Sequence, residues 1–165
     1  MVRKVGVDGI VIGCLTADGT VDQKKMQQLL SVSGGLSVTF HRAFDMCKDP
    51  LEALQIIEEL GCHRILTSGQ CAVAEEGIPL LKELVNRATK TIVMPGCGVN
   101  AGNIQKIALA TGAKEFHLSG RISVEGQMRY RNPSVSMGGV VQVAEYGRDV
   151  TSVDKIKAAI QALEY

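Results

Sequence analysis

The chain has 165 residues, of which 45% are hydrophobic and 21% charged, and its formal net charge is +1 at pH 7. These values are ordinary for a globular protein, and the near-neutral charge excludes the broad basic surface that attracts nucleic acid or an anionic membrane. Aromatic residues are scarce and no apolar run approaches the roughly 20 residues that span a bilayer, so neither a base-stacking platform nor a membrane helix is expected.

A short β-rich run, a loop and a helical segment repeat along the chain. The runs start about 27 residues apart, a spacing that leaves room for one crossover helix between successive parallel strands. Sequence similarity between the units is weak, so the repeat is one of architecture. Five runs are expected to be strands: residues 9–15, 36–41, 64–67, 91–95 and 115–119.

The helical segments carry their own start and stop signals. Asp49 is a good N-cap, Pro50 follows at the first helical position, and Glu52 completes a capping box. Gly61 ends this segment, and Asn100 is expected to cap a later helix. The pattern therefore predicts helices between the strands.

Residues 36–41 alternate between large apolar and polar side chains. Val38 and Phe40 fall on one face of the expected strand, and His41 falls on the other. A strand covered by helices turns its apolar side chains toward them, so the polar set is expected to face away from the helices. His41 and, in the last run, Ser119 then lie at the carboxyl ends of strands, where α/β barrels place their functional sites.

These elements predict an α/β fold in a single domain over residues 1–165. Two architectures suit repeated βα units, a TIM-type (β/α)₈ barrel and an open doubly wound sheet. In both of them the carboxyl ends of the strands form the functional edge, so the same candidate residues follow from either architecture.

The cysteines indicate a reducing compartment. The chain has five of them, an odd number, and none forms a C-x-x-C pair. This argues against a disulfide framework and favours free thiols. Residues 1–5 contain no signal-peptide core and are expected to lead straight into structure. A cytoplasmic location is therefore expected.

Several motifs together resemble one known family. Residues 38–45 (VTFHRAFD) are similar to the hallmark segment of the CutC family, whose members are copper homeostasis proteins. Further segments agree with that family in order and spacing, and the resemblance covers essentially the whole chain. They are residues 15–19, 64–69, 94–99, 115–119 and 128–132.

The resemblance implies a TIM-type (β/α)₈ barrel and a protein of the cytoplasm, with the nucleus as a second location in eukaryotic members. It also implies copper handling, with Cu(I) binding in some members, and assembly into homo-oligomers. It does not imply a demonstrated catalytic activity, so the question of an enzyme stays open at this point.

The chain departs from the family pattern at its start. It corresponds to about five βα units, barrel strands four to eight, and lacks the first three strands. Five units cannot close an eight-stranded barrel. A fragment is the favoured explanation, and an isoform or assembly with another chain are the alternatives. The cysteines proposed to bind copper in the family fall in the absent strands.

Sulfur side chains are the remaining candidates for a copper site. Cu(I) prefers thiolate and thioether ligands. Cys14 ends the first run, Cys97 follows the fourth, and Met94 lies close to Cys97 in sequence. The alternative is that Cys14 is a small buried hydrophobic residue and that Cys97 occupies a position requiring a small side chain.

Polar side chains that follow the strands are candidates for a pocket. A histidine, a cation and a carboxylate at one rim can bind an anion or move a proton. The alternative is a purely structural set of hydrogen bonds. The pocket candidates are His41, Arg42, Asp45, Thr67, Ser68, His117, Ser119 and Arg121.

A glycine-rich loop joins the fourth run to a helix and is a candidate anion site. Gly96, Gly98 and Asn100 belong to this loop, whose backbone N–H groups are expected to point toward a phosphate or a similar anion. By the family alignment it follows barrel strand seven, one of the two places where barrels commonly bind phosphate. The alternative is a tight turn that requires glycine.

The sequence does not decide whether two further features have a structural or a functional role. Arg129 and Arg131 form a basic cluster that suits rim electrostatics or an interface as well as substrate binding. The apolar residues 138–143 are expected to cover the end of the barrel or to join a subunit interface.

Three functions remain in view. The first is a cytoplasmic copper homeostasis protein that binds or buffers Cu(I). The second is a barrel enzyme acting on a small anionic or phosphorylated metabolite at the carboxyl-terminal rim, an idea raised by fold analogy. The third is an inactive fragment or interaction module. The expected partners are a copper ion, a small anion and further copies of the chain, without nucleic acid or membrane.

Overall fold

Four parallel strands form the centre of the protein. The computed structural model describes residues 6–138 and 144–164, so the expectations for residues 1–5 and 139–143 lie outside the described residues. Strands β1 (Gly9–Ile12), β2 (Ser37–Phe40), β3 (Arg64–Thr67) and β4 (Ile92–Pro95) pair in the order β1-β2-β3-β4. Helices α1 (Gln23–Ser33), α2 (Pro50–Glu59) and α3 (Ile78–Arg87) connect them, with a 3₁₀ helix, η2 (Arg42–Met46), after β2.

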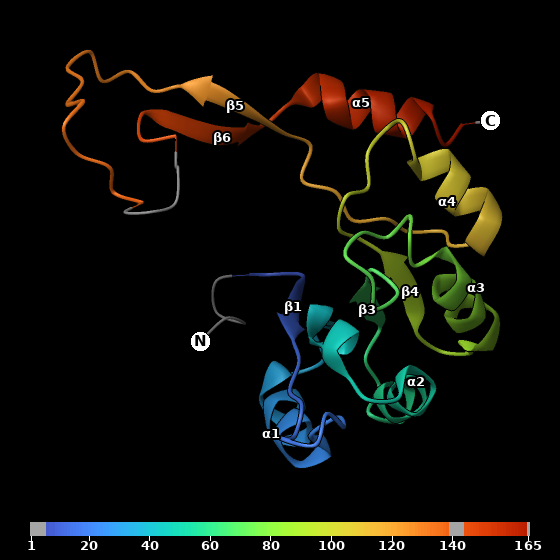
Figure 1. Ribbon diagram of the computed structural model, residues 1–165. Helices are drawn as coiled ribbons and strands as arrows, with labels where there is room; N and C mark the ends of the chain where they lie inside the picture. Colours follow the sequence, from blue (N-terminus) through green and yellow to red (C-terminus); the bar gives the residue numbers. More distant parts are fainter. Residues whose placement is uncertain (1–5, 139–143, 165) are drawn as a thin grey trace.

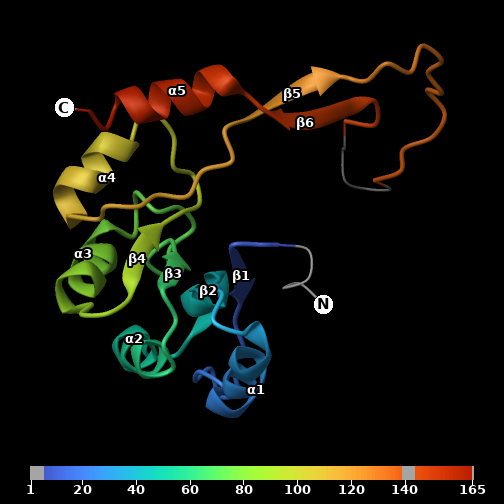
Figure 2. The ribbon, with the colours of Figure 1, turned by 180° about the vertical axis from the view of Figure 1, so that it is seen from behind.

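The strand order bears on the choice between the two expected architectures. Each strand lies beside the next one in sequence, and α1, α2 and α3 lie along one side of the strands (Figures 1 and 2). A doubly wound sheet reverses its strand order and carries helices on both faces. The parallel α/β fold is confirmed, and within the described sheet the reversal that defines a doubly wound fold is absent.

The capping signals around α2 form as expected. The Asp49 carboxylate accepts hydrogen bonds from the backbone N–H groups of Leu51 and Glu52, and Pro50 occupies the first turn. Leu54 and Ile57 are buried on the inner face of this helix. Asn100 does not cap α4 (Ile104–Thr111), because Asn103 occupies that position instead.

The alternation of β2 also has the expected result. Val38 and Phe40 are buried in the core, whereas Ser37 and Thr39 on the other face are half-buried. The core between the sheet and the helices includes the fully buried Met26, Phe44, Ile57, Ile65, Leu81, Leu84, Ile104 and Ile107. This core fixes β2, β3 and β4 and therefore the loops at their carboxyl ends.

Residues 115–119 do not form the fifth strand that the sequence pattern predicted. Only one bridge forms, between Gly96 and His117, with the His117 backbone N–H donating to the Pro95 carbonyl at 2.9 Å. In a parallel ladder the carbonyl of Glu115 would take the next bond from the backbone nitrogen of Pro95, which carries no hydrogen. The segment nevertheless runs beside β4, and Phe116 and Leu118 pack against the core.

An antiparallel hairpin follows, in a part of the chain where the sequence pattern predicted no strand. Strands β5 (Arg121–Glu125) and β6 (Gly147–Thr151) pair with each other alone, and α5 (Val153–Gln161) comes next. Figures 1 and 2 show the hairpin extending away from the four-stranded sheet. None of the helices in the described part of the chain is both long and apolar enough to cross a membrane.

Candidate functional site

The carboxylate of Asp45 is the centre of a hydrogen-bond network at the carboxyl ends of β2 and β3. It accepts from Nε of Arg42 at 2.7 Å, from the Thr67 hydroxyl at 2.5 Å and from the backbone N–H of Ser68 at 3.0 Å. The backbone N–H of Gln70 adds a bond of 3.2 Å. Four pocket candidates, Arg42, Asp45, Thr67 and Ser68, are therefore brought into one network.

This network holds one buried carboxylate and one exposed cation. The Asp45 side chain is 6% exposed and the Arg42 side chain is 43% exposed. Burial raises the pKa of Asp45, but the bonds from Thr67, Arg42, Ser68 and Gln70 outweigh burial and lower that pKa below its ordinary value. The hydrogen bond to Asp45 raises the pKa of Arg42. Asp45 is thus ionised and fixes the direction of the Arg42 guanidinium.

His41 has a structural role next to this network. Its Nδ1 accepts from the backbone N–H of Ala43 at 3.1 Å and so caps η2. Its ring lies against Gly13, where an added Cβ would come within 2.8 Å of the imidazole. His41 is not among the residues that line the cavity described next, whereas His117 is.

A cavity of about 730 Å³ lies beside Arg42. Three cationic side chains line it: Arg42 after β2, Arg121 at the start of β5, and Lys155 in α5. No carboxylate lines it among the described residues. The remaining lining residues are Leu66, Cys97, Gly98, Val99, Asn100, Ala101, His117, Leu118, Ser119, Gly120 and Ala158.

The glycine-rich loop after β4 forms one wall of this cavity. Gly98 and Asn100 line it, and Gly98 has a left-handed φ of +73°. Gly96 does not line it, and is instead buried where an added Cβ would lie 2.4 Å from the Leu66 side chain. The side-chain amide of Asn100 donates to the Gly98 carbonyl at 2.9 Å and stabilises the turn.

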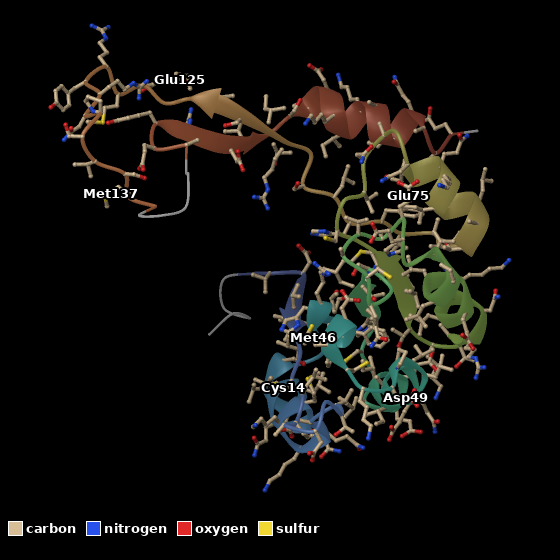
Figure 3. The ribbon with its side chains drawn as sticks, viewed as in Figure 1. Cys14, Met46, Asp49, Glu75, Glu125 and Met137 are labelled. Carbon is tan, nitrogen blue, oxygen red and sulfur yellow. The ribbon has the colours of Figure 1, made fainter. Side chains whose placement is uncertain are left out.

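One of the three sulfur candidates lines this cavity. Cys97 lines the cavity, where its thiol donates to the Ala72 carbonyl at 3.2 Å and interacts with the Arg42 guanidinium. Cys14 does not line the cavity. Figure 3 shows Cys14 beside α1 and away from Glu75, whose carboxylate accepts a hydrogen bond from Asn103 in the loop after β4. Met94 lies on β4 and is half-buried.

Among the described lining residues of the cavity, Cys97 is the one sulfur ligand available to Cu(I). Within residues 6–138 and 144–164 no three His, Cys, Asp or Glu side chains lie together in a way that could hold a metal ion. A guanidinium beside the thiol of Cys97 also opposes the approach of a cation. The copper ligand set of Cys14, Cys97 and Met94 stays a prediction.

Two contributors to the site carried no motif in the sequence. Lys155 comes from the helix that follows the hairpin, and its Nζ donates to the Arg121 carbonyl at 2.7 Å. Gln70 supports Asp45 through a backbone with a left-handed φ of +57°. The one available signal for Lys155 was its position in the first turn of a helix that follows a strand.

Fold and site together define a class: a parallel α/β protein with a cavity lined by cationic side chains at the carboxyl ends of its strands. Comparison with known proteins then makes the assignment specific. The CutC family profile matches residues 1–122. The chain therefore belongs to the CutC family.

Individual relatives agree with this assignment. A CutC family protein of Bacteroides thetaiotaomicron is 56% identical over 165 residues, covering 99% of this chain and 66% of the relative. One from Chromobacterium violaceum is 47% identical over 163 residues, covering 98% of this chain and 66% of the relative. The chain thus spans slightly less than two thirds of the length of these relatives.

A solved structure is also similar. It is a CutC from Streptococcus agalactiae, described as a copper homeostasis protein, with 34% sequence identity and a TM-score of 0.67. The match covers 70% of this chain and 57% of that chain. It supports the parallel α/β arrangement seen here.

Proposed function

We propose that this chain acts in copper homeostasis, with Cu(I) as a cargo that it binds or buffers in the cytoplasm. The observation that carries the proposal is the 56% identity to a CutC family protein over 165 residues. A structural neighbour described as a copper homeostasis protein adds support. No catalytic step is part of this proposal.

The proposal includes the architecture of the complete barrel. The four described βα units and the segment 115–119, which runs beside β4 with a single bridge, would occupy the places of strands four to eight of a (β/α)₈ barrel, making residues 1–165 a single partial domain. The sequential strand order and the helices on one side support this, because a barrel is a sheet wound in one direction. Within the described residues β1 pairs only with β2, and its other edge would then be one of the places where further strands join.

The expected assembly is a homo-oligomer in the cytoplasm, with the nucleus as a second location. Five free cysteines suit a reducing compartment. The loop joining β5 and β6 carries exposed apolar side chains, among them Met128, Tyr130 and Met137, which suit burial against another copy. Light scattering on the purified chain measures its mass, and a monomer at micromolar concentration would contradict this assembly.

A Cu(I) competition titration tests the copper role. The reduced chain competes with a colorimetric Cu(I) chelator, and the Cys14→Ala/Cys97→Ala double variant is measured beside it. Cys71→Ala is the matched control, since Cys71 is also half-buried. The expected result is one Cu(I) per chain in the wild type and the control, and none in the double variant.

The opposite outcome is equally informative. A wild type that binds no more Cu(I) than the double variant contradicts a copper site formed by Cys14 and Cys97. A cooperative thermal melt of each protein is needed first, because an inactive fragment would aggregate or melt without cooperativity.

An enzyme acting on a small anionic or phosphorylated metabolite is the second candidate function, and the cationic cavity favours it.

A further inference from the structure

The cavity beside Arg42 has a charge that the copper role does not explain. Arg42, Arg121 and Lys155 reach it from three separate parts of the chain, and no carboxylate among the described lining residues offsets them. Arg121 has a loose pairing with Asp149, 3.6 Å away, with both side chains more than half exposed. The cavity therefore attracts anions and repels metal cations.

Arg42 is held in place for contact with a ligand. The Asp45 carboxylate accepts a hydrogen bond from Nε of Arg42, and the Ser68 hydroxyl accepts one from Nη2 at 2.9 Å. The described part of the chain offers no oxygen acceptor to its Nη1, and the Cys97 thiol lies beside the guanidinium. An arginine fixed at two of its nitrogens loses little freedom when the third binds an anion.

The loop after β4 adds backbone donors to the same wall. Cys97 and Gly98 both have left-handed φ angles, +77° and +73°. The backbone N–H groups of Gly98 and Val99 donate to no acceptor among residues 6–138 and 144–164. Both residues line the cavity. Successive free N–H groups in such a turn suit the oxygens of a phosphate.

Beside these donors and the polar side chains of Asn100, His117 and Ser119, the lining has an aliphatic part that a bare inorganic ion would leave unused. Leu66, Val99, Ala101, Leu118 and Ala158 contribute aliphatic surface. A volume of about 730 Å³ is also much larger than one phosphate needs and lies in the range of sites for small organic ligands. The cavity thus offers donors for an anionic group and apolar surface for a carbon skeleton.

We infer that this cavity binds a small organic phosphate monoester, with the phosphate toward Arg42, Arg121 and Lys155 and the carbon skeleton against Leu118 and Ala158. A phosphate monoester carries a charge of about −1.5 to −2 at pH 7, which suits three cations better than a single carboxylate does. The inference goes beyond copper homeostasis, rests on the second candidate function by naming its ligand class, and does not depend on any metal site.

Isothermal titration calorimetry with phenyl phosphate, inorganic phosphate and phenol tests the inference at pH 7.5, in buffer free of copper and of phosphate. Phenyl phosphate combines the two expected features, and each of the other probes has one of them. The expected result is saturable binding of one phenyl phosphate per chain, at least tenfold tighter than inorganic phosphate or phenol.

Matched variants locate the site. Arg121→Gln and Lys155→Gln remove exposed cations of the cavity without touching the Asp45 network. Arg148→Gln on β6 and Lys157→Gln on α5 are their controls, since neither side chain lines the cavity. Each cavity variant is expected to weaken phenyl phosphate binding about tenfold or more, as the loss of one charge-assisted hydrogen bond does.

Two results would overturn the inference. One is phenyl phosphate binding no more tightly than phenol, which would leave an apolar cavity without an anion site. The other is equal weakening by Arg148→Gln and Arg121→Gln, which would mean attraction to overall positive charge. Neither result bears on the Cu(I) titration, because copper is absent and both cysteines are kept.

Discussion

Cys97 adopts a backbone conformation that ordinary side chains avoid. Its φ is +77°, a left-handed value that costs a residue with a Cβ roughly 1–2 kcal/mol. Glycine relieves this strain, whereas alanine keeps it. We therefore expect the free energy of unfolding of Cys97→Gly to exceed that of Cys97→Ala by about 1 kcal/mol, measured by urea denaturation of the reduced proteins.

The same pair of substitutions at Cys71 is the control. Cys71 is not among the described non-glycine residues with positive φ. There the glycine variant is expected to be the less stable of the two, because glycine loses more conformational entropy on folding. Equal stability of the two Cys97 variants would contradict strain at that position.

Some of this site could be predicted from single residues and some could not. Arg42 and Asp45 stand three positions apart after a strand, so a contact at the rim followed from the sequence alone. The bonds from Thr67 and Ser68 depend on the register of β2 against β3, and that register has no local signal. Lys155 reaches the cavity through the hairpin, which the pattern missed.

At the scale of elements, Glu58 ties α2 to the turn between α3 and β4. Its Oε1 accepts backbone N–H bonds from Thr89 at 2.7 Å, Lys90 at 2.8 Å and Thr91 at 3.1 Å. The Thr89 hydroxyl donates to Oε2 at 3.0 Å. We expect Glu58→Ala to lower the free energy of unfolding by about 1–3 kcal/mol, because hydrogen bonds to a charged group are lost. Urea denaturation at pH 7 measures this.

The neighbouring Glu59 provides the control for this prediction. Its carboxylate accepts a single exposed bond, from the Gln55 side chain within the same helix. Glu59→Ala is expected to cost less than about 0.5 kcal/mol, the size of an i,i+4 interaction. If Glu58→Ala lowers the free energy of unfolding no more than Glu59→Ala does, the hydrogen bonds of Glu58 contribute nothing to stability.

Strands were predictable where local pattern and pairing agreed. β2 and β3 lie where alternation and β-branched content indicated, and β4 begins one residue later than expected. Residues 115–119 have the alternation of a strand, but Pro95 on the neighbouring strand lacks the donor that would extend the ladder. The hairpin of β5 and β6 joins segments separated by a long loop, a pairing that no short-range turn signal reports.

For the whole molecule, carboxylates with lowered pKa values make stability depend on pH, and Asp45 and Glu58 are the two of them that are partly removed from water. Burial raises the pKa of Asp45 and of Glu58, but in both cases hydrogen bonds outweigh burial and the pKa is lowered. When unfolded, Asp and Glu have pKa values of about 3.9 and 4.3. The unfolded chain therefore takes up protons first as the pH falls, and this proton uptake destabilises the folded state.

The free energy of unfolding is thus expected to be level from pH 7 to about pH 5 and to fall below about pH 4, by up to about 1.4 kcal/mol per pH unit for each carboxylate. Urea denaturation at pH 7, 5, 4 and 3 measures the decline.

Asp45→Asn removes one titrating group that faces Arg42, so its stability is lower at pH 7 and declines less toward pH 3 than that of the wild type. Asp18→Asn, at an exposed position, keeps the full decline. A decline of equal size in Asp45→Asn and wild type would contradict the lowered pKa of Asp45, and with it the view that an ionised Asp45 holds Arg42 at the cavity.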